Sequence, residues 1–196
     1  MRLAVLQLML RPDAESEHRV LAEAIARAVA QGADVVVPPT GIGPDGASEL
    51  HALDVLGRVA LLTGDAAIDE EEYARLGQNP PDALILYPGA ESDIQAEAVF
   101  EVALELSISL ASLVIISERT GAEPGEPGHG GSAVIVLGQV VAEALSDDDI
   151  LIADVMVPLL APDPRAPLPK VPPILAQRLA HHRGQRLSVE YPADLS

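Results

Sequence analysis

The sequence predicts an α/β fold that ends in a proline-rich arm. Over most of the chain, short aliphatic runs alternate with helical patterns, which is typical of sheets covered by helices. Towards the end of this part, three strand-like runs follow one another directly. Prolines then crowd residues 158–173, where an extended backbone is expected. We therefore expect one domain over residues 1–157, followed by a C-terminal arm with a short helix over residues 158–196.

The chain begins with the pattern of a strand, a helix and a second strand. The apolar run at residues 3–8 predicts a strand that is covered on both faces. A helix is expected to run to about residue 31, because apolar residues gather on one of its faces and Gly32 stands where a helix stop belongs. Residues 34–37 predict the second strand, which ends at Pro38 because proline has no N–H for strand pairing.

Strand and helix patterns continue to alternate after a glycine-rich loop at residues 41–46. A short helix is expected over about residues 48–56, and an acidic helix over residues 69–76. Three further apolar runs predict strands, at residues 58–63, 82–87 and 112–117.

A longer helix, expected over about residues 92–110, has two distinct faces. Apolar residues recur at every fourth position and predict its buried face: Ile94, Ala98, Val102 and Leu106. Glutamates recur with the same spacing elsewhere on the helix: Glu97, Glu101 and Glu105. Like charges at this spacing repel one another, so we expect the glutamate stripe to face water.

From residue 133 the pattern changes to consecutive strands. These are expected at residues 133–137, 140–145 and 150–155, with turn sequences between them. Such an arrangement predicts an antiparallel extension of the sheet. The arm that follows ends in a short helix over about residues 174–182, where the adjacent His181 and His182 are expected to be exposed.

Composition excludes several classes of function. The chain has 12 Lys and Arg against 30 Asp and Glu, which gives a net charge of −18. Phosphates would be repelled at long range, so neither nucleic acid nor an anionic membrane is an expected partner. Without cysteine there is no disulfide, no thiolate metal ligand and no cysteine nucleophile. The chain also lacks an apolar run long enough to span a bilayer, so we expect a cytoplasmic protein.

Two glycine-containing motifs invite a functional interpretation. Residues 41–46 match the pattern G-x-G-x-x-G, and Asp65 lies where an acid binding a ribose would stand. However, Pro44 removes a backbone donor and Asp45 places a carboxylate beside the phosphates. Residues 129–132, His-Gly-Gly-Ser, look like the oxyanion loop of esterases, but the chain has no G-x-S-x-G motif. No spacing of histidines and carboxylates indicates a metal site, so we expect neither a metal nor a cofactor.

Several segments, taken in order, resemble the nitrilase or carbon–nitrogen hydrolase superfamily. Residues 2–8 and 30–39 resemble its first β-α-β unit, and residues 57–65 resemble the strand that leads to its nucleophile. Residues 82–88 resemble the next strand, and residues 130–155 its closing hairpin. The resemblance covers about the first 157 residues. It implies a truncated nitrilase-like α-β-β-α sandwich that pairs with a second subunit through its helical face.

That superfamily uses a Glu-Lys-Cys triad of base, charge stabiliser and nucleophile. The resemblance places the glutamate at Thr40 and the cysteine at Thr63, and the segment between them contains no lysine. The single lysine, Lys170, lies in the arm. The resemblance thus implies that no catalytic residue of the family remains. Thr40 and Thr63, together with Asp65 and His129, would be the remnant of its pocket.

Three functions follow from this sequence. The leading hypothesis is a catalytically inactive nitrilase-like protein, a pseudoenzyme that acts by assembly as a homodimer or by binding a protein partner, with the arm reaching across the interface. A second is a hydrolase of amides or other C–N bonds that uses Thr63 or Ser132 with His129 or Asp65, which predicts that these groups converge in one pocket. A third is a module that binds small molecules, nucleotides included, around Thr40 and Thr63.

Overall fold

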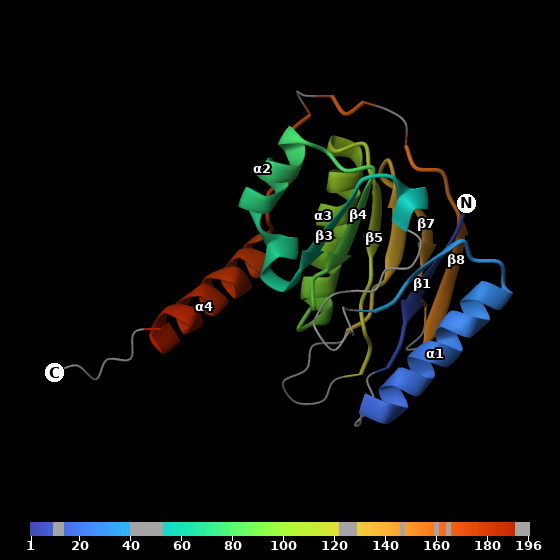
Figure 1. The fold of residues 1–196 in the computed structure, drawn as a ribbon. Coiled ribbons are helices and arrows are strands. Elements are labelled where there is room, and N and C mark those ends of the chain that lie inside the picture. Colours follow the sequence, from blue (N-terminus) through green and yellow to red (C-terminus); the bar gives the residue numbers. More distant parts are fainter. Residues whose placement is uncertain are drawn as a thin grey trace.

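Two β-sheets lie at the centre of the protein, with helices on both outer sides (Figure 1). The computed structural model describes residues 1–9, 14–39, 53–121, 129–145, 148–158, 161–163 and 166–190. Within these ranges the elements follow in the order β1 (Arg2–Gln7), α1 (Ala14–Ala30), β2 (Val35–Val37), η1 (Leu53–Leu56), β3 (Val59–Thr63), η2 (Gly64–Ile68), α2 (Glu70–Gln78), β4 (Ala83–Tyr87), α3 (Asp93–Ser109), β5 (Leu113–Ile116), β6 (Ala133–Val136), β7 (Gln139–Glu143), β8 (Asp149–Asp154) and α4 (Pro173–Glu190), where η denotes a 3-10 helix.

The smaller sheet has the strand order β2-β1-β8 and carries α1 on its outer side. β1 runs parallel to β2 and antiparallel to β8, so that Leu3 lies opposite both Val35 and Ala153. On the side that faces the helix, Ala4 belongs to the same apolar cluster as Ala24 of α1. The predicted first β-α-β unit is therefore confirmed.

The larger sheet has the strand order β3-β4-β5-β6-β7 and carries α2, α3 and α4 on its outer side. Its first three strands are parallel, and β6 and β7 are antiparallel additions. Leu84 of β4 packs outward with Leu106 of α3, whereas its neighbour Ile85 packs inward with Val5 of β1. One apolar layer thus joins the two sheets and one lies under each helical layer, which confirms the α-β-β-α sandwich.

Two sequence predictions about these elements were wrong. Ile94 was expected on the buried face of α3, but it is 66% exposed. Each step of four residues turns a helix by 40° more than a full turn, so Ile94 is rotated by about 120° from Leu106. The buried side of α3 is instead completed by Val99 and Ala103. The glutamate stripe at positions 97, 101 and 105 is exposed, as predicted.

The last three strands were expected to extend one sheet, but they divide between the two. β6 and β7 pair with each other in the larger sheet, while β8 crosses to the smaller sheet and pairs with β1. β8 carries apolar residues on both of its faces. Leu151 packs between the sheets and Ile152 packs towards α1, and this double pattern suits a strand that lies between two apolar layers.

The described part of the arm packs on the rest of the chain. Its helix α4 is longer than the predicted residues 174–182, and Leu175 in its first turn is fully buried in the core formed with α3. The domain boundary at residue 157 stays a prediction. Of the short helix expected over residues 48–56, the described part is the 3-10 turn η1. None of the helices in the described ranges combines the length and apolar character that crossing a membrane requires.

Candidate functional site

The candidate site lies where the parallel strands end. In open α/β sheets, ligands bind outside the carboxyl ends of the strands. Here the ends of strands from both sheets meet, because the hydroxyl of Ser117, just after β5, donates a hydrogen bond of 2.9 Å to the carbonyl of Pro38, just after β2. Gln7 ends β1 and Thr63 ends β3. We refer to this region as the carboxyl edge.

Thr63 occupies the position that the resemblance assigns to the nucleophile. It is the last residue of β3, lies opposite Tyr87 and is exposed. The next residue, Gly64, has a φ of +54°, which turns the chain sharply into η2. Thr40 lies outside the described residues, and so does the loop at residues 41–46. The pocket remnant around Thr40 and the nucleotide-binding loop therefore stay predictions.

The other predicted site residues have partners of their own. A carboxylate oxygen of Asp65 lies 2.8 Å from Nδ1 of His182, whereas Nδ1 of His129 lies 3.1 Å from Asp93 at the start of α3. Ser132 is fully buried, and its backbone N–H donates to Oε1 of Gln7 over 2.9 Å. The structure thus engages Asp65, His129 and Ser132 in three different local interactions.

A buried polar network, the Glu118 network, connects Gln7, Ser132 and Glu118. The backbone N–H of Glu118 donates to the hydroxyl of Ser132 over 2.9 Å, and the side-chain carboxylate of Glu118 accepts a bond of 3.1 Å from the N–H of Ala90. Glu118 is only 2% exposed. Burial raises the pKa of its carboxyl to about 7, although the surrounding N–H groups and the charge of Arg178 oppose the shift.

Sequence reasoning missed Glu118. The residue directly follows the apolar strand at residues 112–117, and a charged residue at the end of such a run was the one available signal. Its burial depends on the loop after β4, which contributes the N–H of Ala90 from 28 positions away. A carboxyl group that changes charge near neutral pH is suited to proton transfer.

A second polar cluster fixes α4 beside the carboxyl edge. We call it the His182 cluster, and it consists of His182, Asp65 and Glu91. The Nδ1 atom of His182 lies 2.8 Å from Asp65, and its Nε2 atom lies 3.1 Å from Glu91. His182 was expected to be exposed, and this prediction was wrong because α4 turns that ring towards η2 and the start of α3. The neighbouring His181 is exposed, as predicted.

Two arginines of α4 add to these contacts. Arg178 is 8% exposed and donates to the carbonyl of Pro88 over 2.8 Å, while its Nε atom lies 3.6 Å from Glu91. Arg183 donates over 2.7 Å to Asp69, the residue that caps α2. The basic face of α4 therefore rests on acidic residues from η2, α2 and the segment before α3.

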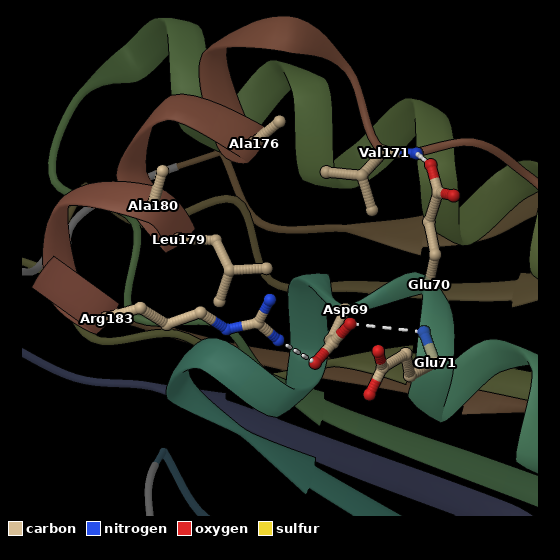
Figure 2. Close-up of a pocket in the computed structure, with 8 residues that line it drawn as sticks. All are labelled: Asp69, Glu70, Glu71, Val171, Ala176, Leu179, Ala180 and Arg183. Carbon is tan, nitrogen blue, oxygen red and sulfur yellow. Dashed lines mark hydrogen bonds and ion pairs between the residues drawn. The ribbon is translucent and has the colours of Figure 1, made fainter.

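A groove of about 430 Å³ lies between α4 and the start of α2 (Figure 2). Apolar side chains of α4, such as Leu179, form one wall, and Val171 closes one end. At the rim, Asp69 accepts hydrogen bonds from Arg183 and from the N–H of Glu71, and Glu70 accepts one from the N–H of Val171. Among the described residues, no group of three or more metal-binding side chains is placed to hold an ion.

Comparison with solved structures identifies amidases with the same fold. The NitN amidase from Nesterenkonia sp. AN1 aligns with a TM-score of 0.65 at 17% identity, over 94% of this chain and 99% of that chain. A mutant of the amidase from Nesterenkonia sp. AN1, in complex with butyramide, aligns with a TM-score of 0.63 at 16% identity, over 79% of this chain and 90% of that chain. Another mutant shows covalent addition of the acetamide moiety of fluoroacetamide at the active-site cysteine; it aligns with a TM-score of 0.64 at 17% identity, over the same shares of the two chains.

The sequence itself matches no family model and no curated protein. At 16% to 17% identity, the likeness to the amidases concerns the arrangement of the backbone. A structure of the Nesterenkonia amidase is described as belonging to the nitrilase superfamily. The chain therefore has the fold of a nitrilase-superfamily amidase, as the resemblance of its ordered segments predicted.

Proposed function

We propose that this protein is a nitrilase-like protein that lacks the thiol chemistry of the superfamily and acts by binding a second copy of itself or a protein partner. One observation carries the proposal. β3, which the resemblance assigns as the strand that leads to the family nucleophile, ends in Thr63, in a chain without cysteine. A hydroxyl is a much weaker nucleophile than a thiolate unless a base activates it. The single lysine, Lys170, stands in the arm and not between Thr40 and Thr63.

The internal bonding of the carboxyl edge supports the same proposal. Ser132 and Glu118 are both buried, and both use their polar atoms for hydrogen bonds within the chain. Asp65 faces His182, and only 14% of the Asp65 side chain is exposed. Groups engaged in this way hold loops together, and a substrate would have to displace those contacts before reaching them.

A surface for self-association is available on α3. Ile94 is 66% exposed and Ile108 is 58% exposed, and both lie on the same outward stripe of the helix as the three glutamates. The proposal takes these two exposed isoleucines as the apolar contact points of the interface, since burial of apolar side chains is what the core of a protein–protein interface provides. The arm contacts α2 and α3 of its own chain, so this proposal places the pairing surface on α3 and does not require the arm to cross the interface.

The mass of the chain in solution tests self-association. We expect light scattering to give the mass of at least a dimer, and the double variant Ile94→Glu, Ile108→Glu to give the mass of a single chain. The matched control is Val29→Glu, which places the same charge at an exposed apolar position of the opposite helical layer and should leave the mass unchanged. A parent chain that is monomeric at every concentration would contradict self-association.

An amidase assay tests the absence of family chemistry. With butyramide or acetamide as substrate, we expect no ammonia release above that of buffer. Release that is abolished by Thr63→Ala would overturn the proposal, because it would show a working hydroxyl nucleophile. The solved neighbours are amidases, so these amides are the appropriate substrates to try.

One observation favours a second candidate, a hydrolase with non-standard residues. Glu118 stands at the carboxyl edge with its pKa raised to about 7, which is the range in which a carboxyl can serve as both acid and base. This candidate predicts amide turnover that Glu118→Gln abolishes while the fold is retained. Turnover that is unaffected by this variant would exclude Glu118 as the base.

A further inference from the structure

The proposed self-association uses α3 and leaves the groove between α4 and the start of α2 without a role. This groove has a volume of about 430 Å³, within the range of about 300–1,000 Å³ that is typical of pockets for small molecules. Its two sides are joined by hydrogen bonds. Arg183 of α4 donates to Asp69 over 2.7 Å, and the N–H of Val171 donates to Glu70 over 2.9 Å. The groove is therefore formed without any ligand.

The two walls of the groove differ in chemistry (Figure 2). The wall formed by α4 and the residues just before it is apolar and includes Val171, Leu179 and Ala180. The opposite wall, at the start of α2, carries the carboxylates of Asp69, Glu70 and Glu71. Acidic residues in the first turn of a helix stabilise that helix by themselves, so their charge alone does not indicate a ligand. Their position opposite an apolar wall, across a groove of this volume, is what indicates one.

The carboxylates of the groove outnumber its cations. Arg183 is the one cation among the described lining residues, and its charge is paired with that of Asp69. Lys170 is exposed and is not part of this lining. Glu70 accepts only a backbone N–H, and none of the described contacts involves the carboxylate of Glu71. Two negative charges of the groove therefore have no cationic partner within its described lining.

This combination of walls discriminates between classes of small molecule. An anion would be repelled by the two glutamates and by the net charge of −18. A neutral apolar molecule would cover the carboxylates without replacing the water that they lose. A quaternary ammonium binds mainly to aromatic faces, and none of the described residues that line the groove is aromatic. A primary ammonium supplies both a positive charge and three N–H donors, which carboxylates accept.

We propose that the groove binds a small primary alkylammonium ion, whose unbranched apolar chain lies along α4 and whose ammonium group donates to Glu70 and Glu71. The chain of the ligand displaces water from Leu179 and Ala180, and the ammonium group neutralises the two glutamates opposite them. This inference is independent of the proposed self-association, which places the pairing surface on α3.

Titration calorimetry of the full chain near neutral pH tests this inference. The probe is n-hexylammonium, which we expect to bind saturably at a single site. Each of three comparison ligands lacks one feature of the probe: hexanol lacks the charge, hexyltrimethylammonium lacks the N–H donors, and methylammonium lacks the apolar chain. Each should bind at least about tenfold more weakly, because it loses a charged hydrogen bond or several buried methylene groups. The absence of saturable binding, or equal affinity for any comparison ligand, would overturn the inference.

Two pairs of variants locate the site. Glu71→Gln removes one charge from the groove and should weaken binding about tenfold, whereas Glu97→Gln removes the same charge from the exposed stripe of α3 and should not. Ala180→Trp should abolish binding by filling the groove, whereas Ala26→Trp, on α1, should not. All four positions are exposed on helices, so we expect the fold to be retained. Affinity that is unchanged in Glu71→Gln or Ala180→Trp, or that falls equally in both members of a pair, would contradict the inference.

Discussion

The Glu118 network and the His182 cluster stand beside the same edge of the fold but are built in opposite ways. The Glu118 network uses single hydrogen bonds between a side chain and a backbone group, in a fully buried setting. The His182 cluster places the ring of His182 between two carboxylates, and all three side chains keep part of their surface in water. A buried polar group is costly to leave without a partner, whereas an exposed ion pair contributes little. We therefore expect the burial of a contact, more than its charge, to decide how much its loss lowers the free energy of unfolding.

The largest expected effect concerns the pH dependence of the Glu118 network. In the unfolded chain this carboxyl loses its proton near its ordinary pKa of 4.5, but in the folded protein it keeps the proton up to a pKa of about 7. Between these values unfolding releases a proton, so raising the pH favours the unfolded state. The contribution of Glu118 to stability is fully present below pH 4.5 and is lost by about pH 7, with a total on the order of 3 kcal/mol.

Urea unfolding of the parent chain and of Glu118→Gln at several pH values measures this contribution. The neutral amide does not titrate, so the free energy of unfolding of the parent should fall relative to that of the variant as the pH rises from about 5 to about 8. A constant difference between the two proteins over this range would show that the carboxyl is ionised in the folded state throughout.

A smaller loss is expected from Ser132→Ala. This change removes the hydroxyl that accepts the N–H of Glu118, in a place that water does not reach, and should lower the free energy of unfolding by about 1–3 kcal/mol. The matched control is Ser109→Ala. Its hydroxyl also bonds to the backbone, at the carbonyl of Pro167, but in an exposed place, so its loss should be smaller. If the two serine variants lost equal amounts of free energy of unfolding, burial would not explain the effect of Ser132→Ala.

The smallest effect is expected for the ion pair between Arg183 and Asp69. Arg183 is more than half exposed, so the pair should contribute roughly 0.2–1 kcal/mol. Asp69 also caps α2 by accepting the N–H of Glu71, so removing it costs more than the pair alone. A double-mutant cycle with Arg183→Ala and Asp69→Ala separates the two contributions. A coupling energy well above this range would show that this exposed pair stabilises the fold as strongly as the buried contacts of the Glu118 network.

The sandwich could be predicted from the sequence because its layers follow from local patterns. The runs at residues 3–6 and 83–87 are apolar at successive positions, and such strands need cover on both faces. The partner of β8 could not be predicted in this way, since its turn sequences fit a hairpin and its pairing with β1 depends on residues about 150 positions away. Ile94 was misplaced because an exact spacing of four drifts around a helix.

Of the candidate site, only the position of Thr63 at the end of its strand could be predicted from the order of the strands. Thr63 ends its strand at the expected place, but the polar groups around it come from distant segments. Asp65 meets His182 across 117 positions, and Gln7 meets Ser132 across 125. Local spacing does not predict such contacts, because they depend on how α4 and the segment before β6 pack against the rest of the chain. The same reason explains why Glu118 and Arg178 gave no signal that identified them as buried.

The crossing of β8 has a consequence for how the chain folds. β1 is the middle strand of the smaller sheet, yet one of its two neighbours, β8, is among the last elements of the sequence, and the terminal amine of Met1 also bonds to the carbonyl of Val155. During synthesis, β1 therefore leaves the ribosome long before its partner exists. Pairings between such distant segments close a large loop and slow the folding reaction. A fragment that ends before residue 149 would expose one whole edge of β1 and should associate with other chains through it.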